Sequence, residues 1–78
     1  MTVELPIEKG MNITIVNDLG AATQYEVIYA SLEVSERYEM LRLCFLDRNT
    51  HSQKTISLYA DQIEVFNTET EELIDLYA

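Results

Sequence analysis

Hydrophobic and polar residues alternate along most of the chain, which is the pattern of β-strands with one buried face. The alternation is clearest at the first strand, where Met11, Ile13 and Ile15 are separated by Asn12 and Thr14. The same pattern predicts four further strands, at about residues 24–34, 38–46, 55–59 and 63–66. The sequence therefore predicts five strands, within about residues 11–66, in a single mainly β domain spanning residues 1–78.

Turn-forming residues separate these segments. Pro6 closes a short extended start, and residues 17–20 (NDLG) have the composition of a tight turn. Residues 35–36 make a polar break, and residues 47–54 are a wholly polar stretch that suits a hairpin loop. Residues 60–62 fit a short turn or a single turn of 3₁₀ helix.

The end of the chain has a helical pattern. Thr68 and Glu71 have the spacing of a capping box, in which a hydroxyl and a carboxylate each satisfy an unpaired backbone N–H. Four apolar side chains then fall on one helical face, namely Leu73, Ile74, Leu76 and Tyr77. The pattern predicts a short α-helix over about residues 69–77. Because such a helix is marginal alone, we expect it to pack on the sheet or on another surface.

Two stretches resemble strands of small SH3-like β-barrels. Residues 9–16 (KGMNITIV) are similar to the opening strand of many such barrels, and residues 56–66 (ISLYADQIEVF) to their closing pair. With the strands between, the resemblance covers about residues 9–66. It implies a small five-stranded antiparallel SH3-like barrel, and a curled sheet with the C-terminal helix packed on it is the alternative. The resemblance concerns fold alone, because small barrels bind peptides, nucleic acids and protein subunits.

Length and charge narrow the range of functions. A chain of 78 residues forms one domain with a thin core. Its net charge of −9 divides into −3 over residues 1–60 and −6 over residues 61–78. The five bases are scattered: Lys9, Arg37, Arg42, Arg48 and Lys54. Because nucleic acids and anionic membranes are bound by clustered Lys and Arg, we expect no direct binding to either.

Cys44 is the only cysteine, so the chain has neither an internal disulfide nor a multi-cysteine metal site. Its apolar neighbours favour a packing role, with activation of the thiol by Arg42 on the same strand face as the alternative. A single thiol fits a reducing compartment. The N-terminus lacks the pattern of a secretory signal and no apolar run could span a bilayer, so we expect a soluble cytoplasmic protein.

Residues with catalytic potential occur singly. His51 lies in the polar loop beside Ser52 with Asp47 nearby, but a Ser/His/Asp site needs a buried, oriented base. We interpret His51 as a solvent-exposed loop residue. The acids near the C-terminus lack the spacing and the loop glycine of a calcium site. The sequence therefore predicts no enzyme, no cofactor and no metal.

The five tyrosines are the most informative residues for binding. Strand alternation places Tyr25, Val27 and Tyr29 on one face, and Tyr38 and Met40 on one face of the next strand. These side chains point outward if the inward set is Ile28, Leu41, Leu43 and Phe45. An outward set suits a protein interface or a basic peptide, whereas the alternative is that the tyrosines fill the barrel or lie under the helix. The candidate partner-binding residues are Tyr25, Tyr29, Tyr38, Met40, Leu73 and Tyr77.

Together these features predict a small acidic, non-catalytic protein-interaction module that binds a protein partner or a second copy of itself. The alternative is an acidic inhibitor whose carboxylates imitate nucleic-acid phosphates and block the basic cleft of a nucleic-acid-binding protein. The charge of residues 61–78 favours this alternative. The mixing of acids with bases in residues 1–60 speaks against it.

Overall fold

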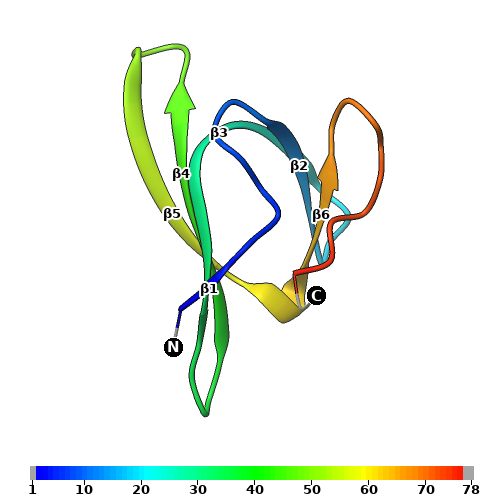
Figure 1. Ribbon diagram of the computed structural model, residues 1–78. Helices are drawn as coiled ribbons and strands as arrows, with labels where there is room; N and C mark the ends of the chain where they lie inside the picture. The colour runs from blue at the N-terminus through cyan, green and yellow to red at the C-terminus, as the bar shows by residue number, and fades with distance from the viewer. Residues whose placement is uncertain (1, 77–78) are drawn as a thin grey trace.

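The computed structural model describes residues 2–76, which form a curved antiparallel β-sheet (Figure 1). Its strands are β1 (Thr2–Glu4), β2 (Asn12–Asn17), β3 (Ala22–Val34), β4 (Glu39–Asp47), β5 (Ser52–Tyr59) and β6 (Ile63–Asn67). A 3₁₀ turn, η1 (Ala60–Gln62), joins β5 to β6. The strand order is β5-β4-β3-β2-β6, and β1 pairs with the second half of β3. The sheet is not closed, because β5 and β6 are its two ends.

The long strand β3 links the two halves of the sheet. Residues 22–26 pair with β2, whereas residues 26–34 pair with β4. The pairing with β4 shifts by one residue between Val27 and Tyr29, so Ile28 has no residue opposite it. A bulge of this kind bends a strand and increases its twist. Figure 1 shows the result, a β3 that curves from the β2 side of the molecule to the β4 side.

The core lies on the concave side of this bend. Its most completely buried side chains come from four strands: Ile13, Val27, Leu32, Leu41, Leu43 and Val65. Leu5 and Ile7, between β1 and β2, and Leu76, after β6, also belong to the cluster. Each such side chain contributes roughly 1.5–3 kcal/mol through its removal from water. A thin sheet therefore needs segments outside its main strands to shield its core.

The sequence pattern located the five main strands to within a few residues and the 3₁₀ turn correctly. The largest difference is at β5, which begins at Ser52 because the β4–β5 turn uses only residues 48–51. Asp47 tightens this turn by accepting a hydrogen bond from the Asn49 N–H at 2.9 Å. The sixth strand, β1, was expected only as a short extended start before Pro6 and not as a strand of the sheet. It has three residues, and its pairing with β3 is long-range.

The predicted C-terminal helix is wrong. After β6 the chain makes a turn in which the Glu71 N–H donates to the Asn67 carbonyl at 2.8 Å. The Asn67 side-chain oxygen also accepts from the Glu69 N–H at 2.9 Å. Glu71 has a φ of 62°, which lies outside the right-handed helical region. Asparagine side chains stabilise turns of this kind, so Asn67 directs the chain away from a helix.

The segment after this turn runs back along β6 instead of forming a helix. The Ile74 N–H donates to the Val65 carbonyl at 2.7 Å, and Phe66 forms a β-bridge with Leu73. The Thr68 hydroxyl, expected to cap the helix, lies 2.8 Å from the Thr14 hydroxyl on β2. The helical spacing of the apolar residues therefore reflects a short extended return. Tyr77, the last residue of the predicted helix, lies outside the described residues.

The core and the surface can be compared with one kind of substitution. Leu43 is fully buried, whereas Leu19, in the β2–β3 turn, is 89% exposed. We expect Leu43→Ala to lower the free energy of unfolding by about 2–5 kcal/mol, because it removes buried contacts and leaves a cavity. Leu19→Ala should change it by roughly 0.5 kcal/mol or less. Urea unfolding measures both, and equal effects would contradict this assignment of the core.

Candidate interaction surface

The convex side of β3, β4 and β5 exposes a group of large side chains. Leu41 and Leu43 point into the core, so the residues that alternate with them on β4 point outward. The register sets Tyr29 opposite Cys44 and Tyr59 opposite Met40, and directly opposite residues share a face of the sheet. We call this group the outer patch, and it consists of Tyr29, Met40, Arg42, Cys44 and Tyr59.

The outer patch is open to solvent at its two tyrosines. Tyr29 is 61% exposed and Tyr59 49% exposed, while Met40 and Cys44 are half-buried beside them. Along β4, Arg42 lies between Met40, which is opposite Tyr59, and Cys44, which is opposite Tyr29. The Arg42 Nε is 2.7 Å from the Glu33 carboxylate. Tyrosine, methionine and arginine are enriched at protein interfaces, because they combine apolar area with hydrogen-bonding groups.

The bulge in β3 determines that Tyr29 faces outward. Val27 is buried and lies opposite Phe45, whereas Tyr29 lies opposite Cys44. In a regular strand Val27 and Tyr29 would share a face, as the sequence pattern predicted. That expectation is wrong, because the extra residue Ile28 reverses the alternation between them.

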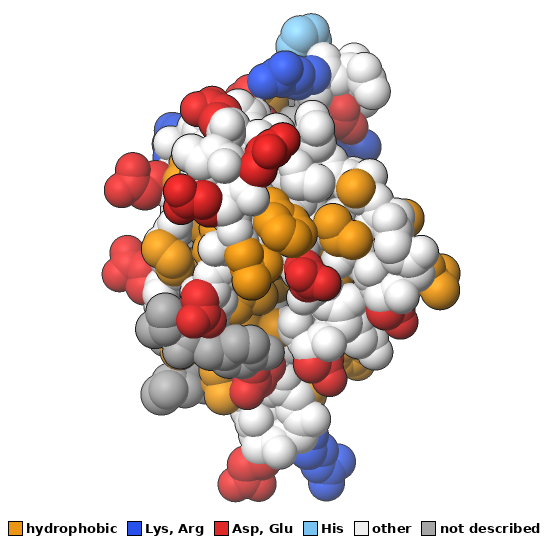
Figure 2. Space-filling model, turned by 90° about the vertical axis from the view of Figure 1, so that its right-hand side faces the viewer, with side chains coloured by type: hydrophobic (Ala, Val, Ile, Leu, Met, Phe, Trp, Pro, Cys, Tyr) orange, Lys and Arg blue, Asp and Glu red, His pale blue; other side chains and the backbone are white. Residues whose placement is uncertain are grey.

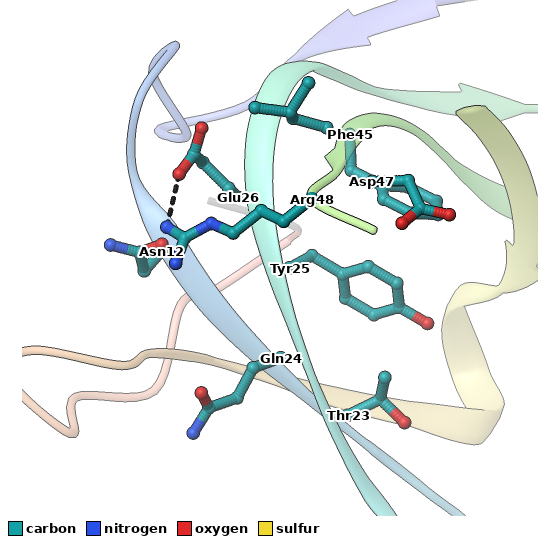
Figure 3. Close-up of a pocket in the computed structure, with 9 residues that line it drawn as sticks. Asn12, Thr23, Gln24, Tyr25, Glu26, Phe45, Asp47 and Arg48 are labelled. Carbon is teal, nitrogen blue, oxygen red and sulfur yellow. Dashed lines mark hydrogen bonds and ion pairs between the residues drawn. The ribbon is translucent and has the colours of Figure 1, made fainter. Parts of the chain in front are cut away.

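Tyr25 lies on the other side of the bulge and takes no part in the outer patch. Its ring packs edge-on against Phe45, with the ring centres 4.8 Å apart, and both rings border the core. They line an open depression of about 390 Å³ (Figure 3). In Figure 3 the Tyr25 ring extends away from the ion pair between Arg48 and Glu26. The two charged groups of that pair neutralise each other.

The remaining predicted binding residues are dispersed. Tyr38 lies in the β3–β4 turn, where its N–H donates to the Ser35 hydroxyl at 3.2 Å. Leu73 is exposed beside β6, at the opposite edge of the sheet from the outer patch. Tyr77 falls outside the described residues. The structure thus brings together only Tyr29 and Met40 of the predicted set.

Sequence analysis missed Tyr59 and the role of Arg42 in this surface. The β4–β5 hairpin pairs Arg42 with Ser57 and Met40 with Tyr59. The polar stretch at residues 47–54 indicated the hairpin, but the pairing register depends on where the turn lies within it. With the turn at residues 48–51 fixed, strand alternation alone would have placed Tyr59 beside Met40.

The residues with catalytic potential lie in different parts of the hairpin. His51 is exposed in the β4–β5 turn with a φ of 54°, and the neighbouring Thr50 and Ser52 hydroxyls bond to each other. Cys44 lies in the middle of β4, opposite Thr55. Within residues 2–76, no three His, Cys, Asp or Glu side chains come close enough together to hold a metal ion.

The β6 side of the molecule is acidic. Residues 55–76 contain no Lys or Arg. We call their carboxylates the acidic group, and its members are Asp61, Glu64, Glu69, Glu71, Glu72 and Asp75. Figure 2 shows this side, with carboxylates spread around a central area of hydrophobic side chains and with Lys and Arg at the upper and lower ends. Positive and negative charges are therefore partly separated across the fold.

Comparison with known proteins gave no match to a family model, to a curated protein or to a solved structure. Within residues 2–76, no helix has the length and the apolar character that crossing a bilayer requires. A function must therefore be inferred from the exposed side chains of the sheet.

The ion pair at the end of β4 gives a pH-dependent contribution to stability. The Lys54 ammonium, 2.7 Å from the Asp47 carboxylate, and the Asn49 N–H hold the pKa of Asp47 below its ordinary value of 3.8. Since the folded-state pKa is the lower one, the pair stabilises the fold above about pH 3.8. That contribution is lost as the pH falls through the lower, folded-state pKa.

We expect Lys54→Gln to raise the pKa of Asp47 toward 3.8, because the largest cause of its depression is removed. An NMR titration of the Asp47 carboxyl carbon measures the midpoint in both proteins. Lys9→Gln, which removes the same charge from the turn before β2, should leave the midpoint unchanged. A midpoint that is the same in Lys54→Gln and in the parent would refute the assigned cause.

Proposed function

We propose that the chain is a small acidic, non-catalytic protein-interaction module that binds a protein partner through the outer patch. The single observation that carries the proposal is the pair of exposed tyrosines, Tyr29 and Tyr59, placed around Arg42 on one sheet face. Tyrosine and arginine dominate the energetics of many interfaces, since each buries a large area and retains a polar end.

The architecture behind this surface is, in our proposal, an SH3-like barrel that remains partly open. Three features support it: the strand order, the bent β3 shared by both halves, and the 3₁₀ turn that leads into β6. The gap between β5 and β6 and the extra strand β1 distinguish it from a closed five-stranded barrel. Such a scaffold holds the outer patch on paired strands, so little ordering is required when a partner binds.

The contacts of Arg42 and Cys44 favour binding over chemistry. Arg42 is held by Glu33, and Cys44 is flanked on neighbouring strands by Tyr29 and Thr55. A specific interface covers about 800 Å² on each partner, which is more than two tyrosines supply. The partner would therefore also contact the polar rows beside them, including Ser57 and Thr55.

A photo-crosslinking amino acid at position 29 tests the proposed surface. We expect it to capture a protein partner in cells, whereas the same probe at position 19 should not, although Leu19 is the more exposed residue. Tyr59→Ala, combined with the probe at position 29, should reduce the capture because it removes a second anchor. Equal or stronger capture from position 19 would refute the outer patch as the binding surface.

The acidic group favours a second candidate function, an inhibitor that imitates nucleic-acid phosphates. Six carboxylates without a Lys or Arg in residues 55–76 would suit a basic cleft. In that case a crosslinking probe at Glu71 should capture the partner, and duplex DNA and added salt should both release it. Capture that resists both treatments would exclude the phosphate-mimicking function.

A further inference from the structure

The two ends of the sheet differ in how their backbone groups are satisfied. At β6, the returning segment covers the edge: the Asn67 N–H donates to the Glu72 carbonyl at 2.9 Å and the Ile74 N–H to the Val65 carbonyl at 2.7 Å. At the other end β5 pairs with β4 alone among the described strands. Its outer side presents a row of backbone donors and acceptors that can pair with another strand.

Strand β5 has only one of the features that usually block such an edge, the charged side chain of Lys54. Its pairing with β4 runs without a bulge, from Tyr59 opposite Met40 to Ser52 opposite Asp47. It contains no proline and no glycine. Edge strands are commonly protected by proline, bulges, short length or charged side chains, and β5 has eight residues with one charge.

That one charge, on Lys54, forms an ion pair within its own sheet. The Lys54 ammonium lies 2.7 Å from the Asp47 carboxylate on β4. Arg48, in the preceding turn, is likewise paired with Glu26 on β3. Residues 48–60 contain no Asp or Glu, so the β5 edge is nearly neutral although the chain carries −9. It is therefore the side on which two copies of this acidic chain approach with the least repulsion.

We propose that β5 pairs antiparallel with β5 of a second copy, extending the sheet across a two-fold axis. The dimer rests on the proposed function only in that the chain acts through protein contacts. It uses the backbone edge of β5, whereas the proposed function uses the side chains of the outer patch. In such a two-fold contact the same strand of each copy pairs with itself, so the strand must not repel its own copy. Strand β5 meets this condition, because its only charged residue, Lys54, is already paired with Asp47.

Strand alternation restricts the register of this pairing. Ile56 and Leu58 lie opposite the buried Leu43 and Leu41, so even-numbered residues of β5 face inward. In a continuous sheet, inward residues must lie opposite inward residues, so the two-fold axis passes through a residue rather than between two. An axis at Lys54 would set two lysines face to face.

An axis at Ile56 gives the most favourable arrangement. It sets the two copies of Ile56 side by side, and it sets Thr55 opposite Ser57 of the second copy on the outer face. It also places the two outer patches on the same side of the extended sheet. A partner with two contact sites would then be bound with a higher effective concentration.

Charged substitutions at positions 55 and 57 test the pairing, with the dimer dissociation constant measured by sedimentation equilibrium over a concentration series. We expect the parent chain to dimerise, and Thr55→Lys with Ser57→Lys to raise the dimer dissociation constant by roughly tenfold or more, because like charges meet at two places. Thr55→Lys with Ser57→Glu should restore the dimer, because each lysine then meets a glutamate. Far-UV circular dichroism checks that both variants fold.

Two further variants separate this proposal from the proposed function. Ala22→Lys with Gln24→Lys adds the same charge at exposed positions remote from β5, and it should leave the dimer intact. Tyr29→Ala should also leave the dimer intact, because Tyr29 lies on β3 and not at the β5 edge. A parent chain that is monomeric at every concentration overturns the dimer, and crosslinking from position 29 would be unaffected by that result. A dimer insensitive to the lysine pair, or not restored by the lysine–glutamate pair, overturns the β5 contact.

Discussion

Ile28 has no residue opposite it on β4, and the bend that it introduces into β3 determines both the core and the surface. Before the bend β3 completes a sheet with β2, and after it β3 completes a sheet with β4. The extra residue also lets Val27 and Ala30, three positions apart, both point into the core. The same shift turns Tyr29 outward. The single-residue bulge at Ile28 therefore directs hydrophobic side chains into the core on both sides of it and exposes Tyr29.

The small size of the chain explains why segments outside the main strands matter so much. Five curved strands do not cover their own concave face, and Leu5, Ile7 and Leu76 supply the missing apolar surface. The same return of the chain that brings Leu76 to the core also pairs with β6 and satisfies that edge. No comparable segment within residues 2–76 reaches β5. The two edges therefore differ because the segment that follows β6 pairs with β6 and not with β5.

Local patterns predicted the parts of this fold that depend on local physics. Period-two alternation located β2 to β6, and turn composition located the hairpins. The C-terminal helix failed because apolar residues at helical spacing were outweighed by the turn around Asn67 and by pairing with β6. The bulge has no signature in composition, since any residue can occupy it, and every face assignment beyond Val27 depends on it. Tyr29 and Met40 could be named from the sequence, but their neighbours required the register.

The distribution of charge connects the two proposed contacts. The acidic group lies on the β6 side, and the bases of the β4–β5 hairpin are each held by a carboxylate of β3 or β4. Two copies meeting through their β6 sides would bring many carboxylates together, whereas copies meeting through β5 would not. A net charge of −9 therefore opposes most encounters between copies and leaves one edge and the adjoining face able to form contacts. The strong acidity, which by itself identifies no partner, thus supports placing the two proposed contacts at the β5 edge and the outer patch.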